Sequence, residues 1–193
     1  RKIAVIGGGA MGSQIAGVCS RVAGIKVNLM DISDELVEKN LQSIEEGLAR
    51  FFVAKGKMTE AEKEAIVGRV KGFTSIGEAA RDADFVIEAV PEILSLKQKV
   101  FREIDAAAPP AVVLASNTSM LNITEIASVT KRPEKVVGMH FFNPVAVMKL
   151  VEVVKGARTS EDTVNLVVAL SRKLAKEPVV CRDTSYGFLA NRA

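Results

Sequence analysis

The chain has 193 residues, of which 48% are hydrophobic, enough for the core of one domain or of one domain and the start of another. Its formal net charge of +3 is mild and its basic and acidic residues alternate, which excludes a general nucleic-acid-binding surface. A single histidine and two widely separated cysteines argue against a metal site, and no stretch approaches the length of a membrane span.

Strands and helices are predicted to alternate along the chain, which favours a mainly parallel sheet with helices on both faces. The expected strands cover residues 3–6, 27–30, 85–90, 111–115, 136–140, 150–154 and 178–181. The expected helices cover residues 10–23, 34–54, 59–70, 93–107 and 161–174.

The connection between residues 31 and 73 is about twice the length that one crossover helix needs. We interpret residues 32–71 as a helical hairpin inserted after the second strand, turning at Lys55-Gly56-Lys57. Thr59 is the expected N-cap of its second helix, and Glu62 completes a capping box. Such a projecting hairpin either contacts a substrate or partner or serves only to extend the packed core. The sequence of the hairpin is compatible with both roles.

A glycine-rich turn with the G-x-G-x-x-G pattern follows the first strand and opens the first helix. Gly7 would permit the tight turn, Gly9 the close approach of a pyrophosphate, and Gly12 tight packing of helix on strand. The helix N-terminus favours an anion through its N–H groups and dipole. We therefore expect a dinucleotide to contact Gly7, Gly9, Ala10, Met11 and Gly12.

Asp31 ends the second strand, nineteen positions after Gly12. Its carboxylate would hydrogen-bond the adenosine ribose and repel a 2′-phosphate, and no arginine or lysine follows it closely. The pattern predicts NAD rather than NADP, bound to a doubly wound α/β sheet of the Rossmann type.

His140 is the only histidine, and an imidazole is the natural side chain to exchange a proton near neutral pH. By itself, a histidine beside two phenylalanines is at least as well explained as a core residue. The segments EAVPE (88–92), SNTS (116–119), GMHFFNP (138–144), MKLVEVV (148–154) and GFLANR (187–192), with the glycine turn, alter that balance. In order and spacing they resemble the L-3-hydroxyacyl-CoA (3-hydroxybutyryl-CoA) dehydrogenases.

The resemblance implies NAD-dependent oxidation of an L-3-hydroxyacyl-CoA to the 3-oxoacyl-CoA, as in fatty-acid β-oxidation or butyrate-type metabolism. His140 would be the general base, held through its other nitrogen by Glu152. Ser119 would hydrogen-bond the substrate's 3-oxygen, and Asn191 would help to hold the substrate. A partner such as His140 would also explain a carboxylate that faces inward from an apolar strand, because an unpaired buried carboxylate is costly.

Further contacts follow from the same resemblance. The residues expected near the cofactor are Ala89, Glu92, Lys97, Ser119 and Asn143. The hairpin would meet the CoA moiety, with Arg50, Lys55 and Lys57 as phosphate partners. Read without the family, Lys97 is a solvated helix charge, Asn143 a turn residue, and the basic residues an exposed helix end. Gly47 stands where relatives place a serine contact.

The resemblance also divides the chain into an NAD-binding domain (residues 1–183) and a linker (184–193) that starts a helical C-terminal domain. In the family that second domain closes the cleft and supplies most of the dimer contact. With that domain absent from this chain, we expect the 193 residues to bind NAD but to turn over poorly. The whole protein is expected to be a cytoplasmic homodimer, or a mitochondrial one, without nucleic-acid or membrane partners.

Two other functions fit parts of the sequence. One is a related NAD-dependent hydroxyacid dehydrogenase that acts without CoA, which would not need the basic hairpin residues. The other is a non-catalytic NAD-binding module. Against the module stand Ser119, His140, Glu152 and Asn191, because NAD binding alone requires no proton-transfer pair.

Overall fold

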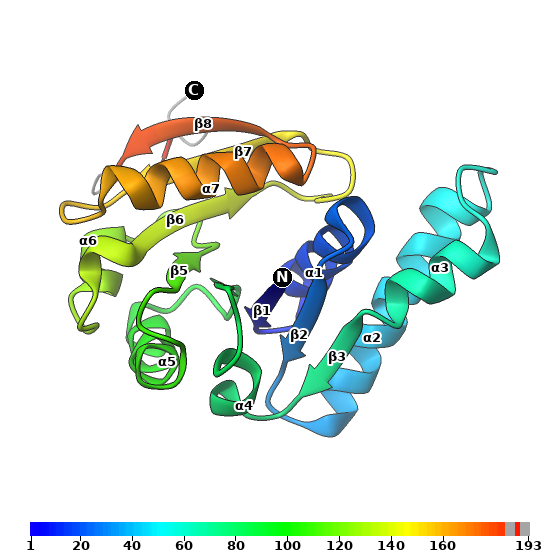
Figure 1. Cartoon of the computed structure of the whole chain (residues 1–193), viewed down its shortest axis with the longest axis horizontal. Coiled ribbons are helices and arrows are strands. Elements are labelled where there is room, and N and C mark those ends of the chain that lie inside the picture. Colours follow the sequence, from blue (N-terminus) through cyan, green and yellow to red (C-terminus); the bar gives the residue numbers. More distant parts are fainter. Residues whose placement is uncertain (184–187, 190–193) are drawn as a thin grey trace.

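A computed structural model describes residues 1–183, 188 and 189. Within these residues, eight strands form one sheet in the order β3-β2-β1-β4-β5-β6-β7-β8 (Figure 1). The strands are β1 (Lys2–Ile6), β2 (Lys26–Met30), β3 (Val70–Phe73), β4 (Phe85–Glu88), β5 (Val113–Ser116), β6 (Val136–Phe141), β7 (Leu150–Lys155) and β8 (Glu177–Arg182).

The first six strands pair in parallel, β7 pairs antiparallel with β6, and β8 pairs in parallel with β7. The chain builds outward from β1 to β3 and then returns to place β4 on the other side of β1. Ligands of doubly wound sheets bind at such a switch point, beyond the carboxyl ends of the strands. The predicted mainly parallel α/β sheet is confirmed.

Helices cover both faces of the sheet (Figure 1). Each face of the sheet packs against apolar side chains of the helices that cover it. One face carries α1 (Ala10–Ala23), α2 (Asp34–Leu48), α3 (Glu60–Val67) and α7 (Glu161–Lys173). The other carries α4 (Ile76–Ala80), α5 (Leu94–Ala107) and α6 (Ile123–Ala127). In the part of the chain that the structure describes, no helix combines the length and apolar character that a bilayer crossing requires.

The segment after β2 forms the predicted helical hairpin, which extends away from the sheet (Figure 1). Its first arm is α2, continued by one turn of π-helix at Ala49–Val53, and its second arm is α3. The predicted capping box at the start of α3 is present, because Thr59 and Glu62 exchange side-chain to backbone hydrogen bonds.

The second arm is shorter than predicted, because the chain leaves the helix after Val67 and forms β3. The prediction of a helix to residue 70 is wrong there, since Val70 already pairs with Val27 of β2. A Cβ on Gly72 would lie 2.2 Å from Val37 Cγ1, so the glycine lets α2 pack directly on this strand. The five-residue helices α4 and α6 were also missed, being too short for a helical period.

The exit from α7 places a non-glycine residue in the left-handed region. Ala175 has φ +57°, and the next N–H, that of Lys176, donates to the Ser171 carbonyl at 2.9 Å. Left-handed backbone costs an L-residue about 1–2 kcal/mol, a cost that glycine avoids.

We therefore expect Ala175→Gly to raise the free energy of unfolding by about 0.5–1 kcal/mol, after the extra chain entropy of glycine is subtracted. The measurement is urea unfolding followed by circular dichroism. Ala169→Gly, at an exposed position within α7, is the matched control and should lower stability by about 1 kcal/mol. Equal destabilisation by both changes would contradict a strained Ala175.

Candidate active site

The candidate residues gather at one edge of the sheet. Asp31 follows β2, Glu92 follows β4 and Ser119 follows β5, so all three lie beyond the carboxyl ends of parallel strands. His140 stands near the carboxyl end of β6. Because β7 runs in the opposite direction, its first half brings Glu152 to the same edge.

His140 and Glu152 are direct cross-strand partners in the β6–β7 register. The His140 Nδ1 lies 2.7 Å from the Glu152 Oε2, which is the contact that the family resemblance implies. The histidine is 8% exposed and the glutamate 1%. A carboxylate at Nδ1 places the proton of the neutral ring on that nitrogen, which leaves Nε2 as the proton acceptor.

Aromatic rings flank the imidazole. The ring centroid of Phe142 lies 4.5 Å from that of His140, and the centroid of Phe188 lies 6.0 Å away, both in tilted arrangements. Phe188 is 2% exposed. Glu152 and the two rings therefore fix the orientation of the histidine.

Glu92 organises the turn that contains Ser119. Its Oε1 accepts hydrogen bonds from the Thr118 hydroxyl (2.5 Å), the Ser119 N–H (2.8 Å) and hydroxyl (3.2 Å), and the Met120 N–H (3.1 Å). Burial opposes ionisation of Glu92, but the hydrogen bond from Thr118, the charge of Lys97 and the backbone N–H groups outweigh it and lower its pKa. The carboxylate therefore stays ionised and holds the turn.

Lys97 lies behind Glu92 and is 1% exposed. Its Nζ contacts the Glu88 Oε1 at 2.7 Å, the Val90 carbonyl at 3.0 Å and the Glu92 Oε2 at 3.4 Å. The interpretation of Lys97 as a solvated helix charge is wrong, because its ammonium group is buried and forms an ion pair with Glu88.

Glu88, at the end of β4, is fully buried and was not identified from the sequence as a site residue. It accepts from Lys97, the Ser116 hydroxyl (2.6 Å) and the Val90 N–H (2.6 Å). Burial raises the pKa of Glu88, and the charge of Lys97 opposes that rise. The sequence signal that could have identified Glu88 is an acidic residue at the end of an otherwise apolar strand.

The glycine turn has the geometry that a dinucleotide cradle requires. Gly7 has φ +95° and its Cβ would lie 2.9 Å from the Ala89 backbone, while a Cβ on Gly12 would lie 1.8 Å from the Gly7 carbonyl oxygen. Gly9 differs, since a Cβ there would meet no protein atom within 4 Å. The protein itself thus gives no packing reason for glycine at this position, but a pyrophosphate approaching the backbone does.

The N-terminus of α1 fits the same ligand. Its N-cap is Gly9, which supplies no side-chain cap, and its first turn, at Ala10 and Met11, has no acidic residue. No acidic side chain of this first turn therefore competes for its free N–H groups, as an anion site needs.

Asp31 is fixed at the end of β2. Its Oδ2 accepts from the Asn40 Nδ2 (2.7 Å) and the Gly8 N–H (3.1 Å), and its Oδ1 accepts from the Ile32 N–H (2.8 Å). Asn40, which is buried on α2, was missed because nothing in the local pattern links it to Asp31. These contacts hold the carboxylate beside the glycine turn, where a ribose hydroxyl would meet it.

Asn143 follows β6 and is linked to α1. Its Oδ1 accepts from the Gln14 Nε2 at 3.1 Å, and the Gln14 Oε1 accepts from the Val145 N–H at 2.9 Å. Gln14, another residue that the sequence did not single out, thereby links the loop after β6 to α1.

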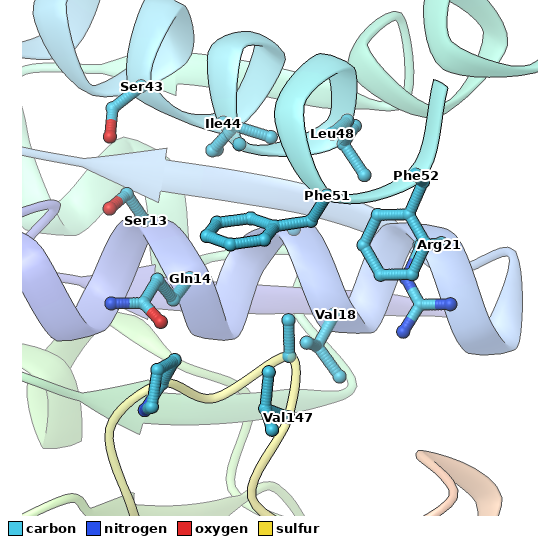
Figure 2. Close-up of a pocket in the computed structure, with 14 residues that line it drawn as sticks. Ser13, Gln14, Val18, Arg21, Ser43, Ile44, Leu48, Phe51, Phe52 and Val147 are labelled. Atoms are coloured by element: carbon cyan, nitrogen blue, oxygen red, sulfur yellow. The ribbon is translucent and has the colours of Figure 1, made fainter. Parts of the chain in front are cut away.

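The basic residues predicted for the CoA moiety lie apart from His140, on the hairpin. Arg50, Lys55 and Lys57 are exposed. The Arg50 guanidinium and the Lys55 ammonium lie 5.5 and 5.9 Å from the centre of the Phe51 ring. Phe51 and Gly47 line a pocket between the hairpin and α1 (Figure 2). The predicted substrate contact Asn191 lies outside the described residues.

The fold and this edge of the sheet define an NAD-binding domain of the Rossmann class. Residues 2–184 match the family model described as 3-hydroxyacyl-CoA dehydrogenase, NAD binding domain. The chain belongs to that family, and its cofactor is NAD.

Similar proteins agree with this assignment. A probable 3-hydroxybutyryl-CoA dehydrogenase of Bacillus subtilis is 45% identical over 100% of this chain and 66% of its own length. The mitochondrial hydroxyacyl-coenzyme A dehydrogenase of Sus scrofa is 40% identical over 100% of this chain and 62% of its own. The crystal structure of (S)-3-hydroxybutyryl-CoA dehydrogenase from Ralstonia eutropha superposes with a TM-score of 0.95 at 42% identity, covering 100% and 66% of the two chains. This chain thus spans about two thirds of the length of these relatives.

We expect Gly9→Ala to weaken NADH binding by at least about tenfold, because the added methyl occupies the space in which the pyrophosphate approaches. Stability should change by less than about 1 kcal/mol, because the methyl meets no protein atom. Fluorescence titration with NADH and urea unfolding measure the two effects. Unchanged affinity for NADH would contradict the cradle.

We expect Lys97→Met to lower the free energy of unfolding at neutral pH by about 3–5 kcal/mol, because it leaves Glu88 buried without its cation. Loss of the cation raises the pKa of Glu88 further, so the folded state retains a proton that the unfolded chain releases. The loss should therefore grow between pH 5 and pH 8 and shrink on acidification.

The control is the double variant Glu88→Gln, Lys97→Met, which has no titrating group at position 88, so its stability should not fall with rising pH as that of the single variant does. Urea unfolding at several pH values measures both. A pH-independent loss in the single variant would show that Glu88 is not the titrating group.

Proposed function

We propose that this protein acts in the NAD-dependent oxidation of L-3-hydroxyacyl-CoA to 3-oxoacyl-CoA. The observation that carries the proposal is the buried His140–Glu152 pair, 2.7 Å apart at the cofactor edge of the sheet. Binding of NAD alone uses the glycine turn and Asp31 and gives no reason to bury a histidine on a carboxylate.

In the proposed reaction, His140 takes the proton of the substrate's 3-hydroxyl group on Nε2. The imidazolium that forms is stabilised by Glu152, and the attraction is strong because neither side chain is well exposed to water. NAD, when bound, supplies the hydride acceptor. The His140–Glu152 pair thus accepts the hydroxyl proton that is released as C3 is oxidised.

Ser119 is proposed to donate its hydroxyl to the substrate's 3-oxygen. The hydroxyl points to Glu92 at 3.2 Å, and the Ser119 N–H remains bound to the same carboxylate at 2.8 Å. The hydroxyl can therefore turn to a substrate while the backbone stays fixed. Asn191 is proposed, from the family pattern, to hold the substrate within reach of His140.

The CoA moiety is proposed to bind at the hairpin. Arg50, Lys55 and Lys57 offer exposed cations beside the aromatic face of Phe51, which suits a nucleotide with phosphate groups. These basic residues favour a CoA substrate over a free hydroxyacid, for which the hairpin would have no evident use.

We expect the protein to oxidise NADH when given acetoacetyl-CoA, and His140→Ala to lower kcat by about 10²- to 10⁴-fold through loss of the proton-transfer group. The Kd for NADH should not change, because His140 belongs to neither the glycine turn nor the Asp31 contacts. Turnover is measured by the loss of NADH absorbance, and NADH binding is measured by fluorescence titration.

Acetoacetate is the control substrate that separates the alternatives. Activity with acetoacetate equal to that with acetoacetyl-CoA would favour a CoA-independent hydroxyacid dehydrogenase. Turnover in His140→Ala equal to that of the unaltered protein would refute the role of the histidine.

A further inference from the structure

A pocket of about 200 Å³ lies between α1, the hairpin and the loop that follows β6 (Figure 2). Gln14, Gly17, Val18 and Arg21 recur every three or four residues, so one face of α1 forms its floor. The pocket is polar at the end formed by Ser13, Gln14 and Ser43, and Arg21 lies at the other end (Figure 2). Its remaining walls are mainly apolar and aromatic, including Ile44, Leu48, Phe51 and Val147.

Arg21 is an unusual wall residue, because it is half-buried without an anionic partner. Its guanidinium carbon lies 4.3 Å from the centre of the Phe52 ring, and burial lowers its pKa. Throughout residues 1–183, 188 and 189, no carboxylate forms an ion pair with it. Stacking on Phe52 holds the guanidinium plane and leaves its N–H donors at the edge for an acceptor.

The surroundings of Arg21 add positive charge. Lys176, 8% exposed, donates to the carbonyls of Val145 and Met148 in the loop beside the pocket. Burial lowers the pKa of Lys176, and the neighbouring charge of Arg21 lowers it further. Arg50 and Lys55 stand over Phe51 on the hairpin side. Among the residues that the structure describes, no acidic side chain lines the pocket, so its electrostatic potential favours an anion.

We propose that Arg21 binds a phosphoryl group of the CoA substrate, with the pantetheine arm along the apolar wall of this pocket. The proposal rests on the proposed function and assigns to Arg21 a specificity role that the sequence did not reveal.

The positions of Gln14 and Arg21 at opposite ends of the pocket determine the orientation in which the proposed ligand would bind. Gln14 contacts Asn143, which follows the strand that contains His140, so the Gln14 end is the one next to the catalytic strand. Arg21 lies seven residues further along α1, about 10 Å away. A ligand that enters with its thioester toward His140 therefore directs its phosphoryl groups toward Arg21. The hydroxyls of Ser13 and Ser43 suit the amides of the arm, and the apolar wall suits its methyl groups.

The test compares Arg21→Met, which removes the charge but keeps an aliphatic chain over Phe52, with Arg21→Lys, which keeps the charge. KM is measured for acetoacetyl-CoA and for acetoacetyl-pantetheine, which has no phosphoryl group. Arg21→Met should raise the KM for acetoacetyl-CoA by about 10- to 100-fold, the value of a lost charge-assisted hydrogen bond. The KM for acetoacetyl-pantetheine should not change, and Arg21→Lys should retain most of the affinity.

Arg102→Met is the matched control, because Arg102 is exposed on α5, on the opposite face of the sheet, and its removal should alter neither KM. Acetoacetyl-dephospho-CoA, which lacks the 3′-phosphate, identifies the group that is bound. If Arg21→Met also raises the KM for acetoacetyl-dephospho-CoA, Arg21 contacts the pyrophosphate. If Arg21→Met leaves that KM unchanged, Arg21 contacts the 3′-phosphate. Both results support a phosphoryl site.

An equal rise in KM for both thioesters would mean that Arg21 only supports the pocket wall, and that result would overturn the proposal, as would no rise for either. If the unaltered protein reduces neither thioester, the proposed function itself fails. Calorimetry with CoA and no second substrate still tests Arg21 in that case, because Arg21→Met should weaken CoA binding while NADH binding is unchanged.

Discussion

The antiparallel pairing of β7 with β6 is the constraint on which the site depends. In a fully parallel sheet, the first half of β7 would lie at the opposite edge, away from the cofactor. Reversal of one strand places Glu152 directly across from His140, and the backbone ladder then holds the two side chains 2.7 Å apart. Because a slip of one residue would turn Glu152 to the other face of the sheet, strand register specifies the pair.

A second set of charges stabilises the same edge from within. Glu88, Lys97 and Glu92 alternate in sign from the end of β4 to the turn at Ser119. Buried charges gain little net stability, but each restricts the position of its neighbours because an unpaired one is costly. The position of Ser119 therefore depends on a residue of α5 that never reaches the surface.

The sequence predicted the features that rest on local pattern. The strand–turn–helix around Gly7–Gly12, the capping box at Thr59 and the strands of His140 and Glu152 were found close to their true limits. Features that depend on distant partners were missed. Val70–Phe73 is too short, and too interrupted by Gly72, to signal a strand before β2 is in place. Lys97 and Arg21 resemble ordinary helix charges, because Glu88 and Phe52 meet them only through the fold.

Helix α1 takes part in both halves of the site, since its first turn faces the NAD cradle and its flank lines the pocket that ends at Arg21. Gly9 and Arg21 are twelve residues apart, so the NAD cradle and the proposed phosphoryl contact are separated by about 18 Å along the helix axis. That length is a fixed dimension of the protein, set by the number of residues in one helix. An insertion or deletion in α1 would change the spacing between the cofactor phosphates and those of the proposed CoA substrate, whereas a change in the hairpin would leave that spacing intact.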